Sequence, residues 1–131
     1  MSNFKSKYEE NLKSGTLLIQ KEFYNASVHC FYYACIQLML HILYDKEGFS
    51  QKDIELEQKK SQTGFHSWII KKFTNFLQGK EKREFNNYIQ QLKSKRVEAD
   101  YLENLISLEE IELTKNYANY VKELLTKTFE L

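Results

Sequence analysis

Apolar residues recur at helical spacing along most of the chain, and this pattern predicts an all-α protein. The first predicted helix covers residues 2–23, with Ser2 as its N-cap and Gly15 as an interruption. The second covers residues 24–44 and carries apolar side chains on almost every side. A helix that is apolar all round belongs at the centre of a bundle or beneath a partner subunit.

Three further helices are predicted after a polar stretch. Residues 49–62 are polar and charged, and they predict a loop, with or without one helical turn. Helices follow over residues 64–77 and 81–104, and the last begins at Ser107, which forms an S-x-x-E capping box with Glu110. Because the connections are short, neighbouring helices should be antiparallel. We therefore expect one domain over the whole chain, folded as an antiparallel up-and-down bundle of four to five helices.

Composition agrees with this fold class. The chain has no proline and only four glycines, whereas a turn-rich β protein needs more of both. It also lacks an apolar leader and an uncharged apolar run of membrane-spanning length, so we expect a cytoplasmic protein with no membrane partner. Cys30 and Cys35 lie five residues apart on one helix and cannot bridge each other, so they are interpreted as small buried side chains.

Charge is unevenly distributed, although the net charge is only +1. Residues 59–96 hold ten Lys or Arg and two Glu, whereas residues 97–131 hold eight acids and three Lys. Such a division can create a basic face for anions or RNA. It can equally place a basic helix beside an acidic one within the bundle or a dimer.

Arg96 is the most informative single position. It lies four residues after Leu92 and three before Ala99, on the apolar stripe of its helix. A buried guanidinium needs carboxylate or carbonyl partners, and Asp100 at i+4 is the nearest candidate. Two interpretations remain open: an ion pair that ties helices together, or an arginine that receives a phosphate.

The histidines and a tyrosine pair suggest structural roles first. His29 and His41 are twelve residues apart and do not form an i, i+4 metal pair, so neither a metal nor a cofactor is predicted. His66 opens the helix over residues 64–77 and can bond the backbone or a neighbouring helix. The adjacent Tyr32 and Tyr33 are expected in the core or at an interface.

Three segments resemble, in order and separation, segments of small bacterial proteins of the HEPN (higher eukaryotes and prokaryotes nucleotide-binding) family. SVHCFYYA at 27–34 is similar to their "YYA" helix, and GFHS at 64–67 resembles the "HS" opening of a later helix. KRVEADY at 95–101 resembles their "R-x-x-A-D-Y" segment. The resemblance implies a helical domain that pairs with a second copy of itself.

Many members of that family are ribonucleases with Arg-x(4–6)-His, in which arginine stabilises phosphate charge and imidazole moves protons. In this chain Tyr101, Leu102 and Glu103 occupy the places of the histidine after Arg96. Tyrosine, with a pKa of about 10, is a poor base at neutral pH. Other members are toxin-like partners of nucleotidyltransferases that modify a tyrosine, and Glu103 stands at the matching place here.

Three functions are therefore considered, and a protein without catalytic activity is favoured over an enzyme. The first is a non-catalytic HEPN-like homodimer of a toxin–antitoxin or defence-type system, with a nucleotidyltransferase-type protein as a further partner. The second is a ribonuclease with a non-standard site formed by Arg96, Asp100, Tyr101 and His66. The third is a nucleotide- or nucleic-acid-binding module that uses the basic segment 59–96.

Overall fold

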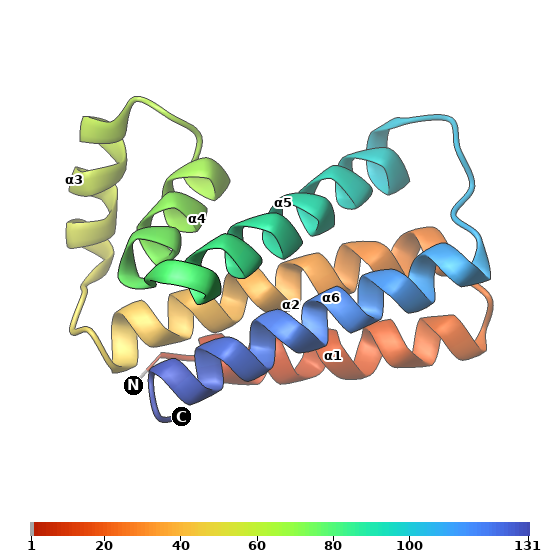
Figure 1. Cartoon of the computed structure of the whole chain (residues 1–131), viewed down its shortest axis with the longest axis horizontal. Coiled ribbons are helices and arrows are strands. Elements are labelled where there is room, and N and C mark those ends of the chain that lie inside the picture. Colours follow the sequence, from red (N-terminus) through yellow and green to blue (C-terminus); the bar gives the residue numbers. More distant parts are fainter. Residues whose placement is uncertain (1) are drawn as a thin grey trace.

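The computed structural model describes residues 2–131, and these residues form six helices and no strand (Figure 1). The helices are α1 (Phe4–Gln20), α2 (Tyr24–Asp45), α3 (Gln51–Ser61), α4 (Phe65–Phe76), α5 (Gly79–Tyr101) and α6 (Leu108–Thr128). The all-α prediction is confirmed. The expected number of four to five helices is too low, because the polar stretch before α4 is itself helical.

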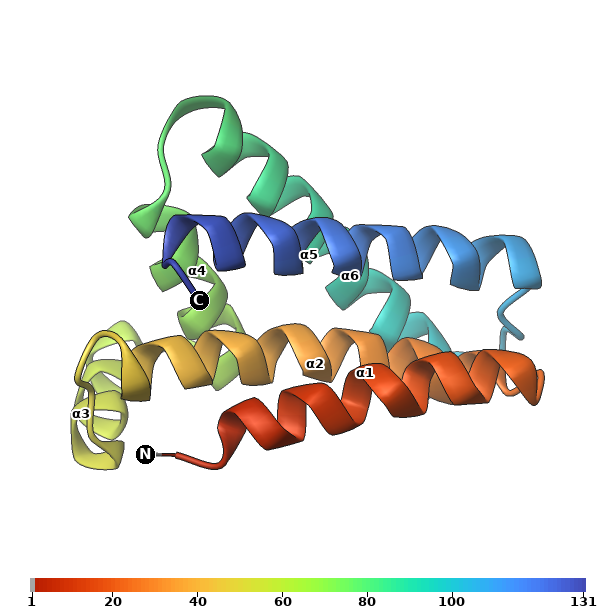
Figure 2. The same ribbon diagram turned by 90° about the horizontal axis from the view of Figure 1, so that it is seen from below.

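The long helix α2 is the centre of the fold. It packs against α1, α4, α5 and α6. Figures 1 and 2 show α2 turning back beside α1, α6 running in the same direction as α2, and α5 crossing them obliquely. The pair α3 and α4 stands at the end of α2 where that helix finishes.

Burial accounts for the all-round apolar character of α2. Among residues 2–131, α2 alone is long and apolar enough to cross a membrane by length and composition. Two-thirds of its most apolar window (67%) is nevertheless buried inside the bundle, as in the core helix of a globular protein. Phe31, Tyr32 and Met39 are among its largest fully buried side chains, and Cys35 is buried beside them.

Helix α3 corrects the prediction of a loop over residues 49–62. It begins with a capping box in which the Ser50 hydroxyl accepts from the amide of Asp53 at 3.1 Å, and the Asp53 carboxylate accepts from the amide of Ser50 at 2.8 Å. Only Ile54 is buried, so no apolar stripe marks this helix in the sequence. Its capping box and one ion pair to α4, rather than a core face, define it.

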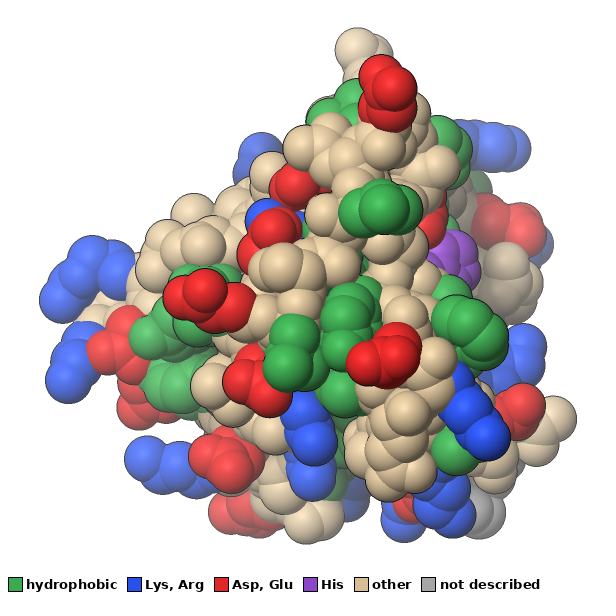
Figure 3. Space-filling model, turned by 90° about the vertical axis from the view of Figure 1, so that its right-hand side faces the viewer, with side chains coloured by type: hydrophobic (Ala, Val, Ile, Leu, Met, Phe, Trp, Pro, Cys, Tyr) green, Lys and Arg blue, Asp and Glu red, His purple; other side chains and the backbone are tan. Residues whose placement is uncertain are grey.

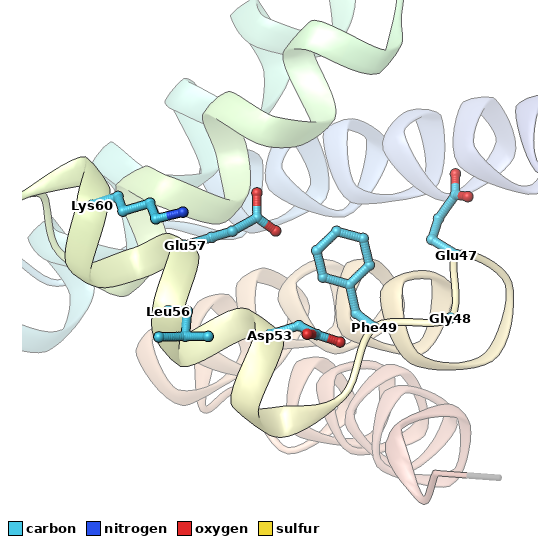
Figure 4. Close-up of a pocket in the computed structure, with 7 residues that line it drawn as sticks. All are labelled: Glu47, Gly48, Phe49, Asp53, Leu56, Glu57 and Lys60. Carbon is cyan, nitrogen blue, oxygen red and sulfur yellow. The ribbon is translucent and has the colours of Figure 1, made fainter.

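Helix α3 is attached to α4 by one charged side chain. Lys72 lies 3.1 Å from Glu57 of α3 and 4.6 Å from the ring centre of Phe49. Figure 4 shows Glu57 and Phe49 turned toward the same hollow between the α2–α3 connection and α3. A cation between a carboxylate and an aromatic face holds α3 with little apolar burial.

The predicted N-cap is confirmed for α6 and is wrong for α1. Ser107 caps α6, because its hydroxyl accepts from the amide of Glu110 at 3.1 Å, while the Glu110 carboxylate binds the same hydroxyl rather than the Ser107 amide. Ser2 does not cap α1, whose N-cap is Asn3. The Ser2 amide and hydroxyl instead donate to the Asp45 carboxylate at 3.0 and 3.1 Å, and this ties the start of α1 to the end of α2.

Candidate functional site

The candidate site lies where α4 and α5 meet the same side of α2 (Figure 1). We call its residues the Arg96 cluster; they are His29, Tyr32, Tyr33, His66, Arg96, Asp100 and Tyr101. The first three residues belong to α2, and His66 lies in the first turn of α4. Arg96, Asp100 and Tyr101 lie in the last two turns of α5.

Arg96 is buried, as its position on the apolar stripe predicts, with 9% of its surface exposed. Its guanidinium carbon lies 5.2 Å from the ring centre of Tyr32, 5.8 Å from that of Tyr33 and 5.5 Å from that of Tyr101. These distances are within the range of cation–π attraction. Aromatic faces therefore surround this charge on several sides.

The hydrogen-bond donors of Arg96 are only partly used. One terminal nitrogen lies 3.8 Å from the Asp100 carboxylate and 3.5 Å from the Tyr101 hydroxyl, both long contacts. Its Nε is buried and has no hydrogen-bond partner among the residues that the structure describes. A guanidinium has five N–H donors, and a buried donor left unpaired is costly. The arginine thus retains capacity for a further acceptor.

Asp100 is bound more closely by another residue. Its carboxylate lies 2.8 Å from Nδ1 of His29, one ångström closer than to Arg96. The i+4 pair expected between Arg96 and Asp100 is present, but Asp100 is shared between α2 and α5. Its contact with Arg96 is the longer of the two.

His66 joins the cluster through Tyr32. Its Nδ1 lies 3.0 Å from the Tyr32 hydroxyl, and the two rings are 5.4 Å apart. Burial, followed by the nearby charges of Arg96 and Lys93, lowers the pKa of His66 below its usual value. Burial is also the main reason that the pKa of Tyr32 rises to about 12, although Arg96 opposes that rise. At neutral pH the imidazole is neutral and the phenol keeps its proton.

All four residues proposed from the sequence as a non-standard site meet in this cluster. Asp100 and Tyr101 contact Arg96 directly, whereas His66 reaches it through Tyr32, whose hydroxyl faces the imidazole and whose ring faces the guanidinium. Sequence reasoning assigned Tyr32 to a core or interface and missed this bridging position. The signal was the i, i+3, i+4 spacing of His29, Tyr32 and Tyr33, which places them on one face of α2.

The basic segment 59–96 is divided between internal pairs and exposed positions. Lys95 bonds Glu98 at 3.0 Å and Glu110 of α6 at 2.9 Å, so the basic α5 lies beside the acidic α6 at this point. Lys93 donates to Ser67 at 2.9 Å and links α5 to α4. The exposed members are Lys59, Lys60, Lys71, Lys80, Lys82 and Arg83.

Within residues 2–131, no group of three or more His, Cys, Asp or Glu side chains is arranged to hold a metal ion. His41 pairs with Asp45 at 2.7 Å instead of approaching His29.

Comparison of the chain with protein-family models, with curated proteins and with solved structures gives no match. The class of protein that the fold and the cluster define is thus an all-helical protein with a buried arginine whose carboxylate contact is long. The HEPN resemblance rests on the three sequence segments alone.

Proposed function

We propose that this chain is a HEPN-like cytoplasmic protein of a toxin–antitoxin or defence-type system that acts as a homodimer, with the Arg96 cluster at the face shared by the two copies. The observation that carries the proposal is the buried Arg96 guanidinium, whose Nε has no partner and whose carboxylate contact is long. A second copy can supply an acceptor through the 11% of the Arg96 side chain that stays exposed, whereas Nε itself is enclosed within the chain. In this proposal α1, α2, α5 and α6, which reverse direction one after another along the chain, correspond to the family's helical bundle. Helices α3 and α4 are an insertion between α2 and α5.

The three segments that resemble the family also meet in space. Tyr32 and Tyr33 belong to the first segment, His66 to the second, and Arg96 and Tyr101 to the third. Segments separated by up to about 70 residues thus contribute to one cluster. This convergence supports a shared functional role better than three independent short likenesses do.

Exposed apolar side chains beside Arg96 favour a second copy as the occupant of this face. Val97, Tyr101 and Leu102 are 38%, 72% and 58% exposed. Burying such side chains stabilises an interface, at roughly 25 cal/mol for each Å² removed from water. Because no histidine follows Arg96 at the family's spacing, the dimer is proposed to be non-catalytic, with a nucleotidyltransferase-type protein as its further partner.

The oligomeric state tests this proposal directly. Sedimentation equilibrium of the purified protein at micromolar concentration should give the mass of a dimer. The double variant Val97→Glu, Leu102→Glu should raise the dimer Kd at least tenfold, because both changes place charge on the proposed interface without touching the core. Leu113→Glu is the matched control, since Leu113 is similarly exposed but lies on α6. A wild-type protein that stays monomeric across this range would contradict the proposal.

A second function, RNA cleavage at a non-standard site, is favoured by one specific observation. The neutral His66 imidazole and the fixed Arg96 cation lie on two sides of Tyr32. In this alternative His66 removes the proton of a ribose 2′-hydroxyl, whose oxygen attacks the adjacent phosphorus. Arg96 stabilises the charge on the phosphate while the 5′-oxygen leaves and takes a proton from water. A 2′,3′-cyclic phosphate and a 5′-hydroxyl result, and the His66 imidazolium returns its proton to the solvent.

The two functions are separated by an activity measurement. The alternative predicts metal-independent cleavage of single-stranded RNA that His66→Gln and Arg96→Lys each reduce at least a hundredfold with little change in Tm. Lys71→Gln, an exposed charge on α4, should leave the rate unchanged. If the dimeric wild type cleaves neither structured nor unstructured RNA, the catalytic alternative fails and the non-catalytic homodimer stands.

A further inference from the structure

Exposed apolar side chains lie at the end of the molecule where α1 connects to α2 and α5 connects to α6 (Figure 3). Leu105 in the α5–α6 connection is 88% exposed, Phe23 at the start of α2 is 61% exposed, and Leu108 at the start of α6 is 48% exposed. We call these three residues the end patch. The start of α1 and the end of α6 both lie at the opposite end of the molecule (Figure 1).

Hydrogen bonds hold the end patch together. Asn25, two residues after Phe23, bonds the backbone of Asn104 and Ile106 in the α5–α6 connection. Ile106, the neighbour of Leu105 in the chain, is buried in the core. Leu105 therefore points outward from a loop that is fixed on both sides. A loop that is already ordered loses less conformational entropy when a partner binds it.

Carboxylates without ion-pair partners accompany the end patch. Glu22, Glu103 and Glu109 stand within two residues of its members in the chain, and all three are exposed. None of them forms an ion pair within residues 2–131. Lys21 is the exposed cation of the α1–α2 connection. Three carboxylates against one lysine leave an excess of two negative charges.

The other charges near this end do not cancel the excess. Lys95 is shared by Glu98 and Glu110, which adds a further negative charge. Arg96 is buried beside Asp100, and these two offset each other. Helix dipoles nearly cancel as well, because α1 and α5 end here whereas α2 and α6 begin here. The end patch therefore favours a partner that carries positive charge.

A second copy of the chain does not match this charge. If two copies met patch to patch about a twofold axis, the carboxylates of one copy would face those of the other, and like charges in contact oppose binding. If the end patch bound the basic segment 59–96 of another copy, the contact would repeat from copy to copy and build rings or open filaments. The charges thus favour a different protein as the occupant.

We propose that the end patch docks a basic amphipathic helix of another protein. Leu105 projects from its loop as a single knob, and the apolar stripe of a helix offers holes between four side chains that receive such a knob. Lysine or arginine on either side of that stripe pairs with the carboxylates beside the patch. The end patch shares no residue with the Arg96 cluster or with the proposed dimer face, and it is present in a monomer as well as in a dimer.

Three helical peptides of about five turns test the proposal on the whole chain. The first has leucine on one face and lysine on the other, the second replaces each lysine by glutamate, and the third replaces each leucine by alanine. Each is titrated below its aggregation concentration while two-dimensional amide NMR spectra are recorded. The leucine–lysine peptide should bind at least tenfold more tightly than either of the others, and its shifts should centre on residues 21–24 and 103–109. Equal binding of the lysine and glutamate peptides would overturn the proposal, as would shifts centred elsewhere.

One substitution tests the apolar anchor. Leu105→Ser should weaken the leucine–lysine peptide at least tenfold without changing Tm, because the side chain is almost wholly outside the fold. Leu56→Ser is the matched control, since Leu56 is an exposed leucine of α3, and it should leave the affinity unchanged. Sedimentation that shows assemblies larger than a dimer, lost in Leu105→Ser, would assign the end patch to another copy of the chain and overturn the proposal.

A second pair of changes tests the carboxylates. Glu103→Gln with Glu109→Gln should weaken the leucine–lysine peptide at least threefold and reduce the loss of affinity that added salt causes, because screening acts on these charges. Glu9→Gln with Glu10→Gln removes two exposed charges of α1 and should change neither quantity. Affinity that survives the first pair in a folded protein would contradict the selection of a basic partner.

Discussion

A Cβ placed on Gly15 would lie 3.0 Å from Cζ of Phe31, so the phenyl ring of α2 occupies the space that any other residue at position 15 would need. The backbone approach at this point is close, since the Ser27 hydroxyl donates to the Gly15 carbonyl at 2.7 Å in a buried bond. Phe31 is almost wholly buried and has little freedom to move. Glycine at this position therefore permits the tight contact of α1 with α2.

Replacing Gly15 by valine should lower the free energy of unfolding by about 2 to 3 kcal/mol, because a branched side chain overpacks the Phe31 ring. The loss should exceed the gain that comes from removing glycine from a helix, which is at most about 1 kcal/mol. Urea unfolding of both proteins measures the difference. Lys13→Val, at an exposed position of the same helix, should change stability by less than about 0.5 kcal/mol. If both substitutions lower the free energy of unfolding by the same amount, overpacking against Phe31 is not the cause.

Asn25 holds the connection between α5 and α6 against the start of α2. Its amide donates to the carbonyls of Ala99 and Asn104, both at 3.1 Å, and its oxygen accepts from the amide of Ile106 at 2.9 Å. Asn25→Ala should destabilise the protein by about 2 to 3 kcal/mol, because backbone groups in a partly buried loop lose their partners. Urea unfolding measures the loss, and limited proteolysis should show cleavage within residues 102–107.

The control for Asn25 is Asn86→Ala, at an exposed position in the middle of α5. That change removes an asparagine without breaking a contact between segments, and it should be neutral or slightly stabilising through helix propensity. Figure 3 shows hydrophobic side chains on the end of the molecule where this loop lies. Within the loop Leu105 is 88% exposed and Ile106 is buried at 4%, so the hydrogen bonds of Asn25 and the side chain of Ile106 together fix its position. Unchanged proteolysis in Asn25→Ala would argue against that role of Asn25.

Local pattern predicted the elements that bury an apolar stripe. The central position of α2 and the interior position of Arg96 followed from helical spacing, because side chains at i, i+3 and i+4 share a face. Helix α3 has no such stripe, since Ile54 alone is buried, and the Ser50–Asp53 capping box is the signal that marks its start in the sequence. The expected number of four to five helices is too low for the same reason.

Contacts between distant segments were beyond local pattern. Spacing on α5 paired Arg96 with Asp100 correctly, but nothing within that helix showed that His29, 71 residues away, binds the same carboxylate more closely. The bridge of Tyr32 between His66 and Arg96 likewise depends on how α4 is placed against α2. Such contacts arise from how the helices pack against one another, and no periodic pattern in a single sequence predicts them.

The capping box of α3 provides a local stability test. Ser50→Ala should destabilise α3 by about 1 kcal/mol through the lost bond to the Asp53 amide. Because α3 contributes one buried side chain to the core, amide exchange within residues 51–61 should accelerate several-fold while the global unfolding midpoint changes little. The matched change Ser107→Ala removes the cap of α6, which has six buried residues, and should lower the global midpoint instead. A global effect of both changes would mean that α3 unfolds together with the bundle.

His66 should make stability depend on pH on the acid side of neutrality. Burial first, and then the charges of Arg96 and Lys93, lower the pKa of His66 in the folded state below its ordinary value near 6.5. As pH falls through about 6.5 the unfolded chain binds a proton there more readily than the folded chain does, so stability decreases with falling pH and recovers as pH rises. His66→Gln removes this proton linkage, and the glutamine amide can still bond the Tyr32 hydroxyl. Urea unfolding of both proteins between about pH 5 and pH 7.5 gives the contribution of His66 as the difference between the two pH profiles, in which the other titrating groups cancel. As pH falls, the free energy of unfolding of the variant should rise relative to that of the wild type. A difference that does not change with pH would show that the pKa of His66 is not lowered in the folded protein.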